Sequence, residues 1–108
     1  MVSTDADGIV TTVNRAASRM LGLAPTAAVG RHYTVAFGAP AYLDLVTLMQ
    51  RMERIRADTV ERELQLPLDG RSLTLLASLT ALGGPEGEHL GIVLVFDDLT
   101  EQIGRAHV

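Results

Sequence analysis

The decisive stretch of this sequence reads Leu90-Gly91-Ile92-Val93-Leu94-Val95-Phe96-Asp97-Asp98-Leu99-Thr100, an apolar run followed by two carboxylates and a threonine. The apolar part, residues 90–96, has the length and β-branched content of a buried strand. Thr100 is a suitable helix N-cap, because its hydroxyl can accept from the free amides of a first turn. Glu101 would then lie where the helix dipole favours negative charge. We therefore predict a core strand that leads directly into a helix over residues 101–108.

The composition bounds the size and class of the protein. With 108 residues and 47% hydrophobic side chains, the chain is long and apolar enough for one domain with a single core. The formal net charge of −4 argues against nucleic acid as a partner, since phosphate contacts need clustered Lys and Arg. There is no cysteine, which excludes disulfides, thiolate metal sites and cysteine nucleophiles.

Hydropathy also bears on location. No apolar run approaches the roughly 20 residues that a membrane-spanning helix needs, and no basic segment of the signal-peptide type begins the sequence. We therefore expect a cytoplasmic segment without direct membrane contact, cut from a longer protein that can itself be membrane-anchored.

The first third of the sequence predicts a hairpin followed by short helices. Two β-branched runs flank Asp5-Ala6-Asp7-Gly8, and Asp-Gly between such runs is a strong turn signal. Asn14 is a good N-cap for a short helix over Arg15–Leu21, which Gly22 should end. Pro25 favours the start of another short helix.

The longest helical pattern covers residues 40–56. Apolar residues recur there at spacings of three and four, which gives one stripe for the core. The stripe consists of Tyr42, Leu45, Val46, Met49, Met52 and Ile55.

From residue 63 onward the period changes to two, which is typical of strands. Residues 63–68 and 73–81 alternate around Asp69-Gly70, a second hairpin signal. Pro67 should lie on an edge strand or near a strand end, because it cannot donate to a ladder. We predict that the core face of these strands consists of Leu66, Leu73, Leu75, Ala77 and Leu79. An early hairpin, several helices and three late strands make an α+β fold, with one sheet and the helices on one face.

Four short motifs in this order resemble PAS sensor domains. Asp5-Ala6-Asp7-Gly8-Ile9-Val10 is similar to the opening hairpin of that family, and residues 14–22 resemble its Asn-x-Ala-Ala helix. Val29-Gly30-Arg31 resembles the Ile-Gly-Lys/Arg loop, and Asp98-Leu99-Thr100 the closing Asp-x-Thr. The tail from Phe96 to Ile103 looks most like PAS domains that precede the core of nitrogen-regulation-type sensor histidine kinases.

The resemblance implies a PAS fold, a five-stranded antiparallel sheet with helices packed on one face around a small pocket. It assigns residues 1–100 to the PAS domain and residues 101–108 to the start of a truncated output or linker helix. The sequence departs from the family in one respect, since the helix that usually precedes the first strand is missing. A homodimer is nevertheless the expected partnership, together with the kinase or output domain of the parent chain.

The resemblance also implies roles for particular residues. Asp98 and Thr100 are expected to transmit the signal, Asp98 by accepting hydrogen bonds from groups near the start of the sheet and Thr100 by capping the output helix. Asp97 is adjacent and can share that role. Asn14 is expected to be a structural cap.

No cofactor is required by the sequence. Some PAS domains hold haem through a histidine on the long helix, but residues 42–56 contain none. His32, upstream of that helix, is the candidate ligand-binding residue, and the alternative is that it is a solvent-exposed or loop histidine. The flavin–cysteine photochemistry of another PAS branch is excluded by the absence of cysteine. Some relatives bind carboxylates through arginine. Here we expect a solvated, salt-bridged surface, with anion binding as the alternative, for Arg51, Arg54, Arg56, Arg62 and Arg71.

These observations predict a sensory or signal-relay module of a two-component sensor histidine kinase. It would pass a pocket event, or a change from upstream, through the Asp-x-Thr junction to the linker helix. No nucleophile elbow and no metal-ligand spacing is present, so the segment itself is not expected to be an enzyme. The alternatives are a ligand-free dimerisation or spacer module and a small-molecule-binding domain for haem or a dicarboxylate.

Overall fold

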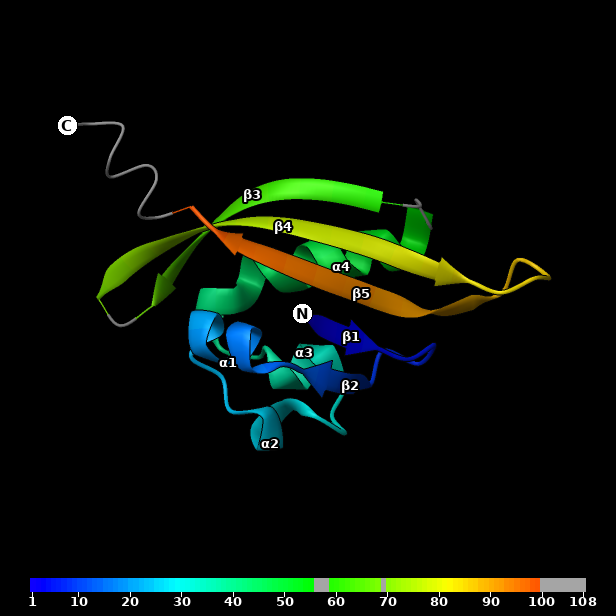
Figure 1. Cartoon of the computed structure of the whole chain (residues 1–108), viewed down its shortest axis with the longest axis horizontal. Helices are drawn as coiled ribbons and strands as arrows, with labels where there is room; N and C mark the ends of the chain where they lie inside the picture. The colour runs from blue at the N-terminus through cyan, green and yellow to red at the C-terminus, as the bar shows by residue number, and fades with distance from the viewer. Residues whose placement is uncertain (56–58, 69, 100–108) are drawn as a thin grey trace.

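The computed structural model describes residues 1–55, 59–68 and 70–99 (Figure 1). Thr100, the predicted helix over 101–108, and Asp69 of the second turn lie outside the described residues. The elements in chain order are β1 (Val2–Thr4), β2 (Val10–Val13), α1 (Arg15–Leu21), α2 (Pro25–Ala28), α3 (Tyr33–Ala36), the 3-10 turn η1 (Pro40–Tyr42), α4 (Leu43–Ile55), β3 (Thr59–Leu68), β4 (Arg71–Gly83) and β5 (His89–Asp98).

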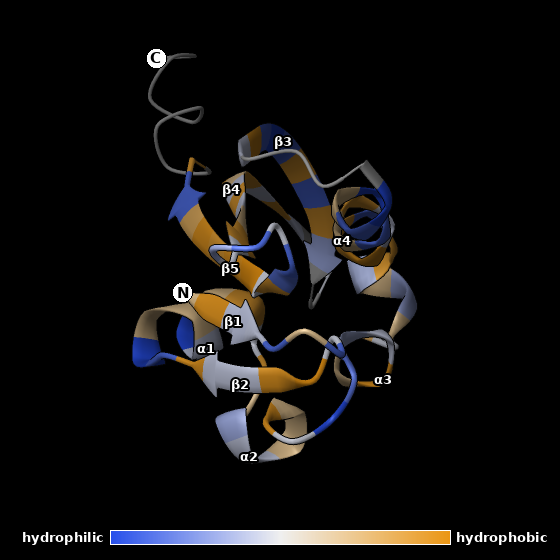
Figure 2. Ribbon diagram, turned by 90° about the vertical axis from the view of Figure 1, so that its right-hand side faces the viewer, coloured by the Kyte–Doolittle hydropathy of each residue, from blue (hydrophilic) through white to orange (hydrophobic). Residues whose placement is uncertain are grey.

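The five strands form one antiparallel sheet in the order β2-β1-β5-β4-β3. The two ends of the described chain therefore meet in the middle, where β1 pairs with β5. Helix α4 packs on β3 and β4, and α3 and α4 lie on the same side of the sheet (Figure 2). This is the predicted α+β arrangement, with the helices on one face.

The early hairpin and the helix after it follow the sequence signals closely. The Asp5 carboxylate accepts from the backbone N–H groups of Asp7 and Ile9, at 2.9 and 3.0 Å, and this fixes the turn. Helix α1 begins after Asn14, whose Oδ1 accepts from Ala17 N at 2.9 Å. It ends at Gly22, which has a left-handed backbone with φ 66°.

The long helical pattern is broken near its start. Residues Pro40–Tyr42 form a 3-10 turn, and the α-helix proper begins at Leu43. The predicted stripe is nevertheless the buried face, because Tyr42, Leu45, Met49 and Met52 are buried. Leu48, which the stripe did not include, is buried as well.

The second hairpin is longer than the alternation indicated, since β3 begins at Thr59. All five residues predicted for its core face are buried: Leu66, Leu73, Leu75, Ala77 and Leu79. Strand β3 is an edge of the sheet, which accommodates Pro67 near its end.

The last strand extends beyond the predicted range of 90–96 and covers His89–Asp98. Asp97 and Asp98 are therefore inside the strand, paired with Leu76 and Leu75 of β4, and not in a segment after it. Acidic residues have low strand propensity, but β4 offers a backbone partner at each position, and this pairing outweighs the propensity.

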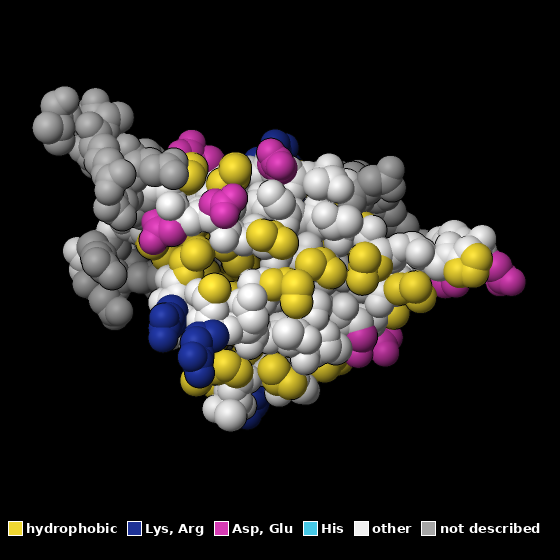
Figure 3. Space-filling model, viewed as in Figure 1, with side chains coloured by type: hydrophobic (Ala, Val, Ile, Leu, Met, Phe, Trp, Pro, Cys, Tyr) yellow, Lys and Arg dark blue, Asp and Glu magenta, His cyan; other side chains and the backbone are white. Residues whose placement is uncertain are grey.

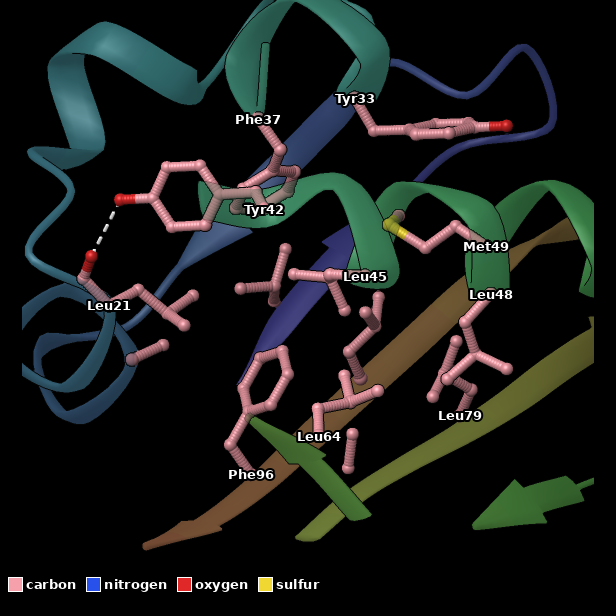
Figure 4. Close-up of a cluster of buried hydrophobic side chains, with 14 of the residues drawn as sticks. Leu21, Tyr33, Phe37, Tyr42, Leu45, Leu48, Met49, Leu64, Leu79 and Phe96 are labelled. Atoms are coloured by element: carbon pink, nitrogen blue, oxygen red, sulfur yellow. Dashed lines mark hydrogen bonds between the residues drawn. The ribbon is translucent and has the colours of Figure 1, made fainter. Parts of the chain in front are cut away.

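The core lies between the sheet and the helices (Figure 4). Phe37, the residue after α3, packs edge-on against Tyr42, with ring centroids 5.6 Å apart. The Tyr42 hydroxyl donates to the Leu21 carbonyl at 2.7 Å, so a buried polar atom is satisfied and α1 is tied to the start of α4. Leu45, Leu64 and Phe96 approach one another below these rings.

Candidate functional site

The end of β5 is the first candidate site, because it is where the core strand leaves the sheet. Asp98 pairs with Leu75, and one residue further the Leu99 N–H donates to the Thr74 carbonyl at 2.8 Å. The backbone is thus held to β4 up to Leu99. Both Asp97 and Asp98 are exposed to solvent.

Strand β5 joins this end directly to the core. Ile92, Leu94 and Phe96 are buried on the helix-facing side, while Val95 on the outer side is 47% exposed. Because a strand is covalently continuous and nearly fully extended, these three buried side chains share one stretch of backbone with the exposed Asp97 and Asp98.

The predicted hydrogen bonds of Asp98 to the start of the sheet stay a prediction. In the register of the sheet, Val2 of β1 lies opposite Leu94, and Val2 in turn lies opposite Val13 of β2. The N-terminus of α1, capped by Asn14, therefore lies toward the same end of the sheet as the end of β5 (Figure 1). Asn14 N also donates to the Met1 carbonyl at 3.0 Å, which ties this end of the hairpin together.

His32 lies away from the end of β5, at the N-terminus of α3. Its Nδ1 accepts from Thr34 N at 3.2 Å and lies 2.8 Å from the Thr34 hydroxyl. The ring stacks on Tyr33 with centroids 4.5 Å apart, and its Nε2 lies against Gly8, where a Cβ would collide with it. The contacts of Nδ1 with Thr34 orient the ring, and the role of His32 in binding a ligand stays a prediction.

Tyr33 and Glu53 form a polar link that the sequence patterns did not indicate. The Tyr33 hydroxyl donates to Glu53 Oε2 at 2.8 Å, joining α3 to α4. Burial, and next the hydrogen bond and charge of Glu53, raise the pKa of Tyr33 well above its usual range. The only available signal was the position of Glu53 beside Met52, at the margin of the apolar stripe.

Two surface hollows flank α4. The larger, about 380 Å³, lies between α3, η1 and α4 and is mostly apolar, with lining residues that include Phe37, Pro40 and Leu43. The smaller, about 160 Å³, lies between α4 and β3 and is called here the α4–β3 groove. It is lined by Asp44, Thr47, Leu48, Arg51, Arg62 and Leu64.

Other kinds of site find no support in the described ranges. No group of three or more His, Asp or Glu side chains lies close enough there to hold a metal ion. None of the described helices is long and apolar enough to span a bilayer.

Comparison with known proteins gives one family. The profile described as PAS fold matches residues 1–99. The chain is 32% identical over 103 residues to the nitrogen regulation protein NtrY of Azorhizobium caulinodans; the match covers 95% of this chain but only 13% of that protein.

Solved structures agree on the fold. The PAS domain of histidine kinase ThkA aligns with a TM-score of 0.69 at 15% identity, covering 90% of this chain and 95% of that chain. The PAS domain of Bordetella pertussis BvgS aligns with a TM-score of 0.70 at 20% identity, covering 98% and 82% respectively.

Proposed function

The chain belongs to the PAS family, and from this premise we propose that it is the sensory or signal-relay module of a sensor histidine kinase similar to NtrY. The identity to NtrY over 95% of the chain supports this proposal. The chain spans only 13% of the length of that relative, so the kinase activity belongs, in this proposal, to other parts of the parent protein. The module would work on the cytoplasmic side, where a kinase domain finds its ATP.

The observation that carries the proposal is the continuity of β5 from core to junction. Ile92, Leu94 and Phe96 pack in the core, and the same strand ends in Asp97 and Asp98. We infer that a change in core packing shifts this end of the strand, and that Asp98 and Thr100 pass the shift to the following helix. This requires two packing states whose equilibrium the signal biases.

Removing the junction side chains should alter output without unfolding the domain. In the full-length parent, Asp98→Ala and Thr100→Ala are each expected to change kinase output about 5-fold or more, the usual size of a coupling between sites. Asp98 is exposed, so its loss should leave the core intact. Autophosphorylation of the parent measures output, and thermal unfolding of the 108-residue chain measures folding.

Asp7→Ala is the matched control, since Asp7 is an exposed acid in the turn between β1 and β2, at a distance from the junction. It should leave kinase output unchanged. Output of wild-type size from both the Asp98 and Thr100 variants would reject their role in transmission.

We also propose that the module pairs with a second copy through the outer face of the sheet. The outer patch consists of Leu76, Leu82, Val93 and Val95, of which Leu82 and Val95 are more than 40% exposed. These residues lie on the central strands β4 and β5, and Figure 3 shows hydrophobic side chains in a broken band across this face. A two-fold symmetric contact would cover the same patch on both copies at once.

A charge in the patch should prevent this pairing. Val95→Lys is expected to convert a concentration-dependent dimer to a monomer, because a buried lysine at the contact would lack a partner. Val29→Lys is the control, since Val29 is similarly exposed (44%) but lies after α2, off the sheet. Sedimentation from micromolar to near-millimolar concentration measures the association. A wild-type monomer throughout this range would show that the patch is ordinary surface.

The rival functions make different predictions for the purified chain. A haem-binding module would show a Soret band, and a small-molecule receptor would retain a ligand detectable by mass spectrometry. A spacer module without sensing would bind nothing and would leave kinase output unchanged when its core is perturbed.

A further inference from the structure

One charged residue occupies a position that the strand pattern assigns to the core. On β3, Leu64 and Leu66 face the helices and are buried, and Arg62 has the same parity. Its register partner on β4 is Ala77, which is fully buried. Arg62 therefore projects from the inner face of the edge strand toward α4.

Helix α4 lines the same groove as Arg62 with a row of polar residues. Asp44, Thr47 and Arg51 lie at spacings of three and four, which places them on the same side of the helix. Together with Arg62 they form the polar walls of the α4–β3 groove, and the buried Leu48 and Leu64 form its apolar floor.

The electrostatics of the groove favour an anion. Within the described part of the chain, no carboxylate lies within the 4.0 Å of an ion pair from either guanidinium, and the Arg62 side chain donates only to the Glu61 carbonyl at 3.4 Å. The sequence predicted a salt-bridged surface for Arg51 and Arg62, and among the described residues neither forms an ion pair. Arg56 and the side chain of Arg71, which were predicted with them, lie outside the described part. Two guanidinium groups and the single carboxylate of Asp44 leave the lining one positive charge in excess.

We propose that the α4–β3 groove binds a small organic monocarboxylate. The guanidinium groups of Arg51 and Arg62 hold its carboxylate, since this group matches their paired donors, and Leu48 and Leu64 contact its apolar body. A volume of about 160 Å³ fits a body the size of a benzene ring. A dicarboxylate is disfavoured, because its second charge would meet Asp44.

The position of the groove gives such a ligand a route to the junction. Leu64 pairs with Leu75 of β4, and Leu75 pairs with Asp98 of β5, so the three residues form one row across the sheet. Arg62, Ala77 and Phe96 form the next row. This regulatory link rests on the proposed sensory function, whereas the binding itself does not.

Inward-facing charges on edge strands also have a structural use, because they discourage pairing with another sheet. That explanation accounts for Arg62 alone. It does not account for Arg51, which lines the same groove from a helix, and it predicts a different result in the following experiment.

The test is a titration of the isotope-labelled 108-residue chain with benzoate, followed by amide chemical shifts. We expect saturable shifts at Leu48 and Leu64, with a dissociation constant on the order of 1 mM, as for other ligands of few atoms. Benzyl alcohol, which lacks the charge, and phthalate, which carries a second one, should bind at least about tenfold more weakly.

The variants Arg51→Gln and Arg62→Gln should each weaken benzoate binding about tenfold or more, since each removes a charge-assisted contact. Arg54→Gln is the control, because Arg54 lies on the same helix, is exposed and does not line the groove. No saturable shift by 20 mM benzoate, or equal binding by Arg62→Gln and wild type, would overturn the proposal. Aggregation of Arg62→Gln with unchanged benzoate affinity would instead assign Arg62 to edge protection. None of these outcomes depends on kinase output, so the proposed sensory function is tested separately.

Discussion

Replacement of Gly91 by alanine is expected to destabilise the domain by about 2–6 kcal/mol, from left-handed backbone strain and from overpacking of about 1–3 kcal/mol each. Gly91 has φ 147°, and a Cβ there would overlap the backbone carbonyl oxygen of Thr4. The side chain would thus be driven between β5 and β1. Because Ile92 N donates to Thr4 Oγ1 next to this point, the pairing of the N-terminal strand should suffer most. Urea unfolding measures the loss.

Gly30→Ala separates the two causes. Gly30 also has a positive φ, 88°, but a Cβ there would meet no atom within 4 Å. The Gly30→Ala variant should lose about 1 kcal/mol of unfolding free energy, from backbone strain alone. Equal losses at Gly91 and Gly30 would show that the close approach of β1 to β5 does not limit the residue at position 91.

The second large effect is expected at Leu75. Leu75 is fully buried at the centre of β4, so Leu75→Ala should cost about 2–5 kcal/mol from lost burial and the cavity left behind. Leu82→Ala on the same strand is the control, since Leu82 is 41% exposed and should lose less than about 1 kcal/mol. A loss below about 0.5 kcal/mol for Leu75→Ala would mean that this side chain lies outside the closed core. Urea unfolding of both variants decides the point.

Leu75 also lies in the row that joins Leu64 to Asp98. A conservative change such as Leu75→Met keeps most of the side-chain volume. If the row transmits a signal, Leu75→Met should change the kinase output of the parent even though it changes the free energy of unfolding little.

Local signals in the sequence determined much of the fold. Asn14 and Gly22 fixed the two ends of α1 to the residue, because capping and the left-handed C-terminal position depend on a few neighbouring atoms. The alternation of Leu73, Leu75, Ala77 and Leu79 gave the buried face of β4, since side-chain direction in a strand follows parity alone.

The candidate sites depended on pairing and packing between distant segments. Asp97 and Asp98 became part of β5 because β4 supplies their backbone partners, and no pattern within residues 90–100 contains that information. The link between Tyr33 and Glu53 joins two helices twenty residues apart in the chain.

The α4–β3 groove is the clearest case in which the sequence predicted the residues and only the packing brought them together. The sequence by itself gave Arg51 and Arg62 only as surface charges, and its strand pattern began at residue 63, after Arg62. Only the tertiary structure decided that α4 lies against β3 at this point, so that the exposed Arg51 and Arg62 line one groove above an apolar floor. The physical reason is that side-chain periodicity is a local property of the backbone, whereas the meeting of two faces depends on how the whole core packs.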